Sequence, residues 1–140
     1  MIFKENKGFS LIELILVLVI IGVLATITFP FLYRAKGVAE NGNAFATMRT
    51  ISSTQLSFFT SKGRFARLSE LNTIHSDALG TISGNDLIRG KFTFEMVPAA
   101  PSDAQLRDSY SIIATKSVVG SELPFVISIS QSGQIVQVLP

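Results

Sequence analysis

The chain lacks cysteine and tryptophan altogether, and His75 is its one histidine. Without cysteine it can form no disulfide bond, no thiolate metal site and no cysteine nucleophile. A lone histidine removes most histidine-based catalysis and most histidine-ligated metal sites. The aspartates are scattered and do not follow the EF-hand spacing. The residues present therefore argue against an enzyme and against a metal site or other cofactor.

Charge is also scarce, and it is nearly balanced. Lysine and arginine number 12 against 10 aspartates and glutamates, which gives a formal net charge of +2. Charged residues make up 16% of the chain, below the roughly 25% usual in soluble domains. The even balance gives no support for nucleic acid as a partner. A length of 140 residues suits one small domain, and 47% hydrophobic residues exclude a disordered chain.

The hydrophobic excess is concentrated near the N-terminus. No charged residue occurs from Leu14 to Leu32, a run of nineteen residues (LILVLVIIGVLATITFPFL). As an α-helix with a rise of about 1.5 Å per residue, this run would extend about 28 Å, close to the roughly 30 Å of bilayer hydrocarbon. The run therefore predicts a helix that inserts into a membrane.

Two general explanations of this run leave residues unaccounted for. A cleaved secretory signal would have a shorter apolar stretch and a small-x-small cleavage site, and only the poor match Ala35-Lys36-Gly37 follows the run. A plain signal anchor fits the length, but it gives no reason for Glu13 at the edge of the run. A carboxylate at the centre of such a helix costs about 2.5–3.5 kcal/mol, and less near the interface.

The residues around Glu13 form a more specific pattern. Lys7–Leu14 (KGFSLIEL) resembles the processing site of type IV prepilins and of the related pseudopilins. The resemblance implies that Met1–Gly8 is a leader peptide, that a prepilin peptidase cuts after Gly8, and that Phe9 becomes an N-methylated terminus. Beyond the apolar run, the resemblance is one of layout: a helix, a variable loop and then strands.

Three further residues match positions of this family. Glu13 matches its glutamate, and Gly22 and Pro30 match its helix-weakening residues. Between neighbouring subunits, the Phe9 amine and the Glu13 carboxylate would attract each other more strongly in a low-dielectric bundle than in water, which would reward one register. In a helix interior, Pro costs about 3 kcal/mol and Gly about 1 kcal/mol relative to Ala. We expect the helix to persist through Gly22–Pro30 in the isolated subunit and to melt there in a filament.

After Tyr33 the pattern remains helical and becomes amphipathic. Phe45, Met48 and Ile51 recur at three-residue spacing among polar residues. Lys62 followed by Gly63 predicts the end of the helix. A helix from Phe9 to Lys62 would be about 80 Å long at 1.5 Å per residue. A single domain of this size cannot cover such a helix, so lipid or other subunits must bury its N-terminal half.

The rest of the chain predicts a loop and then a small antiparallel sheet. Residues 63–90 are turn-rich, with one short helical patch at Leu68–Leu71. In the first predicted strand, Phe92, Phe94 and Met96 alternate with more polar residues, so one face should pack. Gln131-Ser132-Gly133 predicts a hairpin turn before the last strand. Four strands are expected, at Lys91–Val97, Ser109–Thr115, Phe125–Ser130 and Gln134–Leu139.

The predicted fold class is therefore α+β and pilin-like, with a long N-terminal helix packed against an antiparallel sheet of about four strands. We expect three parts. Residues 1–8 form the leader, residues 9–33 the transmembrane and filament-core helix, and residues 34–140 the head. The head then consists of the second half of the helix (34–62), a connecting loop (63–90) and the sheet (91–140).

Other side chains that could carry chemistry have simpler interpretations. His75 lies in a polar segment and is expected to be a solvated loop histidine. The major pseudopilin of type II secretion carries a calcium loop near its C-terminus, but Phe125–Pro140 contains no Asp or Glu, so that site is not carried over. Four basic residues could in principle form a small surface for DNA, which the balanced charge argues against: Arg64, Arg67, Arg89 and Lys91.

The resemblance implies a structural subunit of a type IV pilus-like filament. Its implied partners are the prepilin peptidase, the assembly platform with its cytosolic ATPase, and copies of itself or sister pilins. The precursor would be a single-pass protein of the inner membrane, and the product an extracellular pilus. One alternative is a pseudopilin of a type II secretion system, which forms a short periplasmic pseudopilus. The other is a membrane-anchored binding protein that never polymerises.

Overall fold

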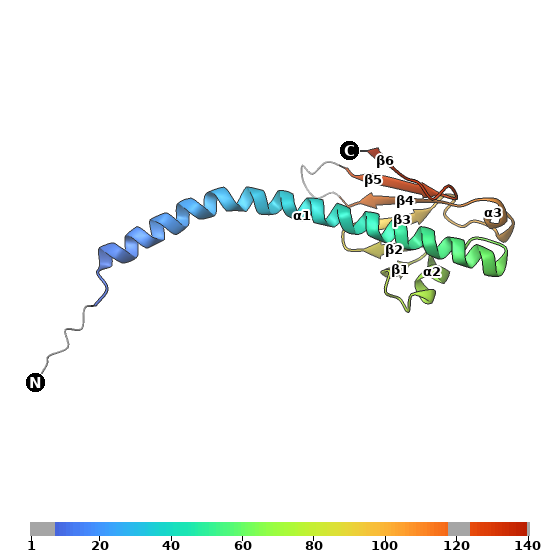
Figure 1. Ribbon diagram of the computed structural model, residues 1–140, viewed down its shortest axis with the longest axis horizontal. Helices are drawn as coiled ribbons and strands as arrows, with labels where there is room; N and C mark the ends of the chain where they lie inside the picture. Colours follow the sequence, from blue (N-terminus) through green and yellow to red (C-terminus); the bar gives the residue numbers. More distant parts are fainter. Residues whose placement is uncertain (1–7, 118–123, 140) are drawn as a thin grey trace, which may run out of the picture. The chain divides into compact units, whose positions relative to one another are not determined.

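The computed structural model describes residues 8–117 and 124–139 (Figure 1). The chain divides into two compact units, Met1–Val38 and Ala39–Pro140. The helix α1 (Leu11–Lys62) contributes to both units, and all strands belong to the second. Residues 1–7 of the predicted leader lie outside the described residues.

Helix α1 confirms the predicted long helix and begins two residues later than expected, at Leu11. It continues through Pro30, as expected for the isolated subunit. Gly63 follows the last helical residue with φ of 68° and donates its N–H to the carbonyl of Phe59 at 2.8 Å. Glycine adopts this left-handed conformation without a steric penalty, so Gly63 ends the helix as predicted.

The sheet has six antiparallel strands rather than about four, and they follow one another in the order β1 to β6. Its two additional strands, β1 (Thr81–Ser83) and β2 (Asp86–Arg89), lie in the segment that was predicted to be a loop. Gly84 has φ of 64° in the turn that joins them. Strands of three and four residues are too short to display an alternating pattern, so the turn residues were interpreted as a loop.

The four predicted strands are confirmed, with ends within two residues of the expected ones. Phe92, Phe94 and Met96 are buried, as their alternation predicted. Gly133 lies in the turn between the last two strands with φ of 72°, and its N–H bonds the Ser130 carbonyl at 2.9 Å. These strands are β3 (Phe92–Met96), β4 (Ser111–Lys116), β5 (Val126–Ser130) and β6 (Ile135–Leu139).

Two short helices complete the second unit. Helix α2 (Leu68–Ile74) contains the predicted helical patch. Helix α3 (Asp103–Asp108) was not predicted. Its start is fixed by a reciprocal capping box, in which the Ser102 side chain accepts from the backbone N–H of Gln105 and the Gln105 side chain accepts from that of Ser102. The spacing S-x-x-Q is the sequence signal that marks this start.

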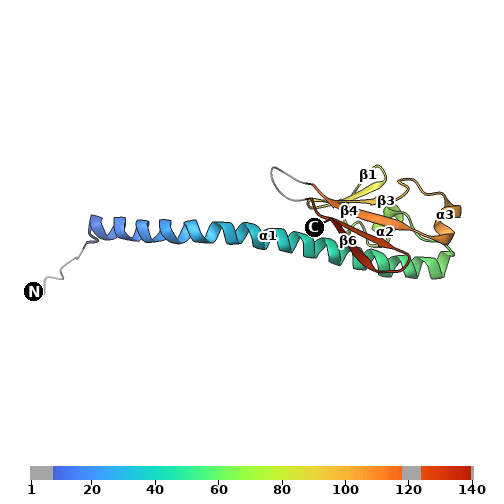
Figure 2. The same ribbon diagram turned by 90° about the horizontal axis from the view of Figure 1, so that it is seen from above.

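The core of the second unit lies between α1 and one face of the sheet, which run side by side in both views (Figures 1 and 2). Met48 and Ile51 are fully buried, and Phe45 is partly buried with its ring edge-on to Phe125 at 6.0 Å between centroids. The buried Gln55 side chain bonds both backbone groups of Ala66, at 2.8 and 2.7 Å. Gln55 therefore holds the chain against α1 just after it reverses direction.

Candidate processing and assembly site

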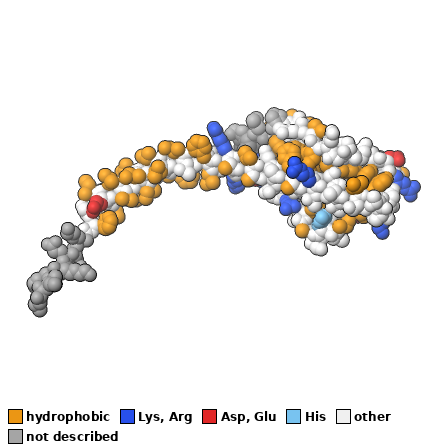
Figure 3. Space-filling model, viewed as in Figure 1, with side chains coloured by type: hydrophobic (Ala, Val, Ile, Leu, Met, Phe, Trp, Pro, Cys, Tyr) orange, Lys and Arg blue, Asp and Glu red, His pale blue; other side chains and the backbone are white. Residues whose placement is uncertain are grey.

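The part of α1 in the first unit exposes its large apolar side chains along its whole length, and Figure 3 shows them on the face in view. The helix is long and apolar enough to cross a membrane, and none of its apolar stretch is buried within the structure. Burying one Leu, Ile, Val or Phe side chain contributes about 1.5–3 kcal/mol. An apolar surface of this extent marks a membrane or protein interaction site, so this half of the helix needs lipid or other subunits around it.

The bond between Gly8 and Phe9 lies outside α1, where it is exposed. The Phe9 side chain is 84% exposed. A Cβ atom added at Gly8 would meet nothing within 4 Å, and Gly8 is not among the residues with positive φ. The fold of the described chain therefore gives no reason for glycine at this position.

Glu13 lies in the first turn of α1 and has a partner within its own chain. Its Oε2 accepts the backbone N–H of Ser10 at 3.0 Å. The first N–H groups of a helix have no partner inside the helix, and a Glu three residues after the cap supplies one. Its negative charge also lies at the positive end of the helix dipole. Glu13 is therefore a helix-capping residue, a role that the spacing S-x-x-E at Ser10 could have revealed.

Gly22 and Pro30 both lie inside the continuous helix. Pro30 has no N–H to give to the carbonyl of Thr26, so one bond of the helix is missing there. The hydroxyls of Thr26 and Thr28 bond the carbonyls of Val23 and Leu24, each at 2.7 Å. These bonds satisfy both hydroxyls within the helix, so neither opposes burial in an apolar environment. Melting of this segment in a filament stays a prediction.

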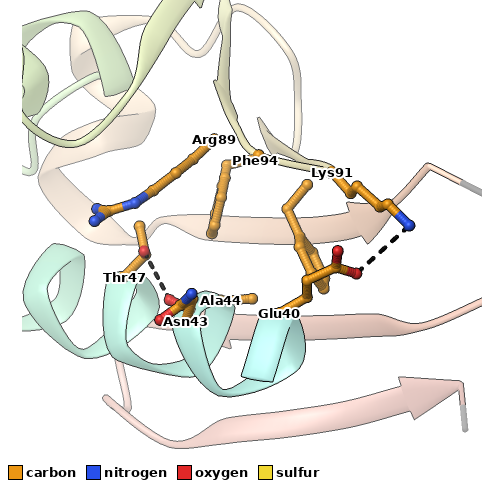
Figure 4. A pocket seen from close by; sticks show the side chains of 9 residues that line it. Glu40, Asn43, Ala44, Thr47, Arg89, Lys91 and Phe94 are labelled. Carbon is orange, nitrogen blue, oxygen red and sulfur yellow. Dashed lines mark hydrogen bonds and ion pairs between the residues drawn. The ribbon is translucent and has the colours of Figure 1, made fainter. Parts of the chain in front are cut away.

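In the second unit, Glu40 links α1 to two strands. Its Oε2 lies 3.2 Å from the Lys116 ammonium of β4 and 3.6 Å from the Lys91 ammonium just before β3. Figure 4 shows Glu40 facing Lys91 at one end of a small pocket of about 150 Å³, with Arg89 at the other. The described residues contain no group of three or more His, Asp or Glu that could hold a metal ion.

A second charged cluster joins the end of α1 to α2 and α3. Arg64 forms a two-pronged pair with Glu70, at 2.9 and 2.6 Å, and Arg67 lies 2.6 Å from Asp103. The hydrogen bonds from Arg64 lower the pKa of the Glu70 carboxyl, although partial burial acts in the opposite direction. Of the four basic residues that could have formed a surface for DNA, Arg64, Arg67 and Lys91 are paired with carboxylates. Arg89 donates to the Leu79 carbonyl at 3.4 Å.

His75 is not the solvated loop histidine that was predicted. It forms the C-cap of α2 and is partly buried. Its Nε2 lies 2.7 Å from Oγ1 of Thr54 on α1. Thr54 is 21 residues earlier in the chain, so this contact depends on the tertiary fold and could not be found from the local sequence.

Comparison with known proteins agrees with this geometry. The family profile described as "Prokaryotic N-terminal methylation motif" matches residues 3–29. The type IV major pilin protein PilA of Myxococcus xanthus (strain DK1622) is 36% identical over 62 residues, which are 44% of this chain and 28% of that pilin. The similarity thus spans less than a third of the relative's length. No solved structure matches the chain.

The α+β fold, the apolar N-terminal helix and the methylation motif define one class of protein. The chain carries a prepilin-type methylation motif and is similar over part of its length to a type IV pilin, and both findings support the resemblance to the type IV pilin family.

Proposed function

We propose that this protein is the subunit of a type IV pilus-like filament, made as a membrane-anchored prepilin. It is cleaved after Gly8, methylated on the amine of Phe9 and polymerised through the apolar half of α1. The observation that carries the proposal is the juxtaposition of two features: an exposed Gly8–Phe9 bond directly before α1, and an apolar helix surface that nothing in the described chain covers. Residues 1–8, 9–33 and 34–140 are then leader, core helix and head.

Glu13 exchanges partners during assembly in this proposal. Before assembly its carboxylate caps its own helix through Ser10. In the filament it pairs with the Phe9 amine of a neighbouring subunit. Two charges about 4 Å apart attract by about 1 kcal/mol in water and by about 4 kcal/mol at an effective dielectric constant of 20. A stagger that places the two groups together is favoured by this energy, so Glu13 sets the register.

The proposed route defines the partners. The precursor resides in the inner membrane, a prepilin peptidase removes the leader, and an assembly platform with its ATPase adds the subunit to copies of itself or to sister pilins. The similarity to a major pilin favours an extracellular pilus over the periplasmic pseudopilus of type II secretion. Filaments on the cell surface would distinguish the pilus from the pseudopilus.

Mass spectrometry of filaments sheared from cells tests the proposal. Loss of 8 residues from 140 leaves 132, so the expected subunit has 132 residues, starts at Phe9 and carries the mass of one added methyl group. A membrane-anchored binding protein that never polymerises would be absent from the sheared fraction and would retain its leader in the membrane. An intact chain starting at Met1 in the membrane, with no filaments, would refute the proposal.

A further inference from the structure

The six-stranded sheet has two open edges, formed by β1 and β6 on opposite sides of the second unit (Figures 1 and 2). Each edge strand pairs on one side only, β1 with β2 and β6 with β5. Among the residues that the structure describes, no strand pairs with the outer side of either. An open edge presents unpaired N–H and C=O groups and can receive a strand from another chain.

The charged side chains of this sheet lie on its inner strands, whereas a protected sheet carries them on its edge strands. Proteins commonly shield edge strands with charged side chains, above all lysine, or with proline. Here the charges lie on the inner strands, for example Arg89 on β2, Glu95 on β3 and Lys116 on β4. Neither β1 (TIS) nor β6 (IVQVL) contains a charged residue or a proline. Neither edge strand therefore carries a protecting charge or proline. The pairing of β6 with β5 is irregular at Val138, so the regular part of this edge is Ile135–Gln137, and β1 is short and lies beside α2.

The apolar side chains of β6 add a second reason for pairing. Val136, Val138 and Leu139 are 55%, 56% and 44% exposed. Of the five residues of β6, only Ile135 is partly buried against the core. Val and Ile are favoured in paired strands because their branched side chains pack against neighbours on a pleated surface. An exposed, uncharged and apolar edge strand of this kind is a site for association.

The strand directions select the partner. In an antiparallel sheet of six consecutive strands, β1 and β6 run in opposite directions. Two copies in the same orientation, as in a filament, therefore place β6 of one antiparallel to β1 of the next. We propose that β6 of each subunit pairs with β1 of a neighbouring subunit, so that the sheets of successive heads join edge to edge. The proposal rests on the filament function proposed above.

Disulfide cross-linking in assembled filaments tests this pairing, and the chain has no native cysteine to interfere. Ser83→Cys on β1 is combined with Val136→Cys on β6, which lies in the regular part of the strand opposite Ser128, and Thr81→Cys with Val136→Cys covers the alternative register. Both β1 positions are exposed. Mild oxidation of sheared filaments should give a ladder of covalent multimers on denaturing gels that returns to monomer on reduction. Filaments of a double variant without a ladder in either register would overturn the proposal.

Ile88→Cys with Val136→Cys is the matched control. Ile88 lies opposite Thr81 on β2, and is also exposed. Strands are spaced about 4.8 Å apart, so this position is about 10 Å from an incoming β6, beyond the roughly 7 Å between Cα atoms that a disulfide spans. A ladder from this control, or dimers from Val136→Cys alone, would place β6 elsewhere and overturn the proposal. Absence of filaments from the unaltered protein would instead refute the filament function.

A charge on the edge provides an independent test. Val136→Lys is compared with Val136→Thr, since both replace an exposed side chain in the regular part of β6 and only lysine opposes strand pairing at an edge. We expect the lysine variant to yield at least tenfold fewer filaments than the threonine variant, with equal amounts of mature subunit in the membrane. Equal filament yields from the two variants would contradict pairing through β6.

Discussion

Replacing Glu13 separates assembly from simple anchoring, because the two functions respond to the change in opposite directions. A simple anchor gains from Glu13→Leu, since a charge leaves the membrane edge. A polymerising subunit loses the partner of the Phe9 amine. That pair is worth about 1–4 kcal/mol at 4 Å, so each subunit contact weakens roughly 5-fold to 700-fold. Leader cleavage should be largely unaffected, since the cut bond lies before Phe9.

The cap that Glu13 provides requires a second variant. Its bond to Ser10 at 3.0 Å satisfies an N–H at the start of α1, and loss of a cap costs about 0.5–2 kcal/mol. Glu13→Gln keeps an oxygen that can accept this N–H and removes the charge. If the charge directs assembly, Glu13→Gln and Glu13→Leu should both lose filaments. If the cap is what matters, Glu13→Gln should assemble normally and only Glu13→Leu should fail.

The assay compares three quantities for each variant: inserted protein, leader-free protein and sheared filaments. Hydrogen exchange of the Ser10 amide in micelles reports the cap, and it should be faster in Glu13→Leu than in Glu13→Gln. Co-expression with the unaltered protein should give partial incorporation, because a variant subunit still offers its Phe9 amine. Glu13→Leu protein that is inserted, cleaved and polymerised at the normal level would refute the assembly role of Glu13.

Three other changes test the site and the fold. Gly8→Trp should leave full-length precursor in the membrane without altering the fold, because nothing lies within 4 Å of this position; normal mature protein would show that another site is cut. Gln55→Leu leaves two buried backbone groups of Ala66 unpaired, so thermal unfolding of the full chain in detergent should show a loss of about 2–4 kcal/mol, and an unchanged transition would contradict that role. Arg64 lowers the pKa of Glu70 in the folded state, so ionised Glu70 stabilises the fold. This stabilisation is present above the unfolded pKa of about 4.3 and is lost as the pH falls through the lower folded pKa. In Glu70→Gln the free energy of unfolding should therefore fall less steeply as the pH is lowered. An acid pH dependence identical to that of the unaltered protein would refute the role of Glu70.

The parts of the fold that the sequence predicted are those with a long pattern. The uncharged run and the spacing of Met48 and Ile51 marked α1, and the alternation of Phe92 and Phe94 marked β3. A pattern needs several repeats to be distinguishable from chance. Strand β1, with three residues, and helix α3, with six, offer too few.

The site was predicted unevenly for a different reason. The motif around Gly8 and Phe9 is local in sequence, so the family resemblance could identify it. The cap from Glu13 to Ser10 is also local, and the spacing S-x-x-E is the signal that could have indicated it. The pair of Glu40 with Lys116, by contrast, joins residues far apart in the chain. No local pattern indicates which of the basic residues will meet Glu40.

The chemistry of α1 limits where the specificity of assembly can reside. Its apolar side chains are exposed in the isolated chain, and they prefer either lipid or neighbouring subunits to water. Transfer from lipid to a helix bundle brings no further hydrophobic gain, since lipid tails are as apolar as leucine. The apolar run therefore keeps the subunit out of water but cannot by itself choose filament over membrane. In the proposed filament, that choice falls to groups that exchange or gain partners on assembly: the Glu13 carboxylate, which would leave Ser10 for a neighbouring Phe9 amine, and the edge strands β1 and β6 of the heads.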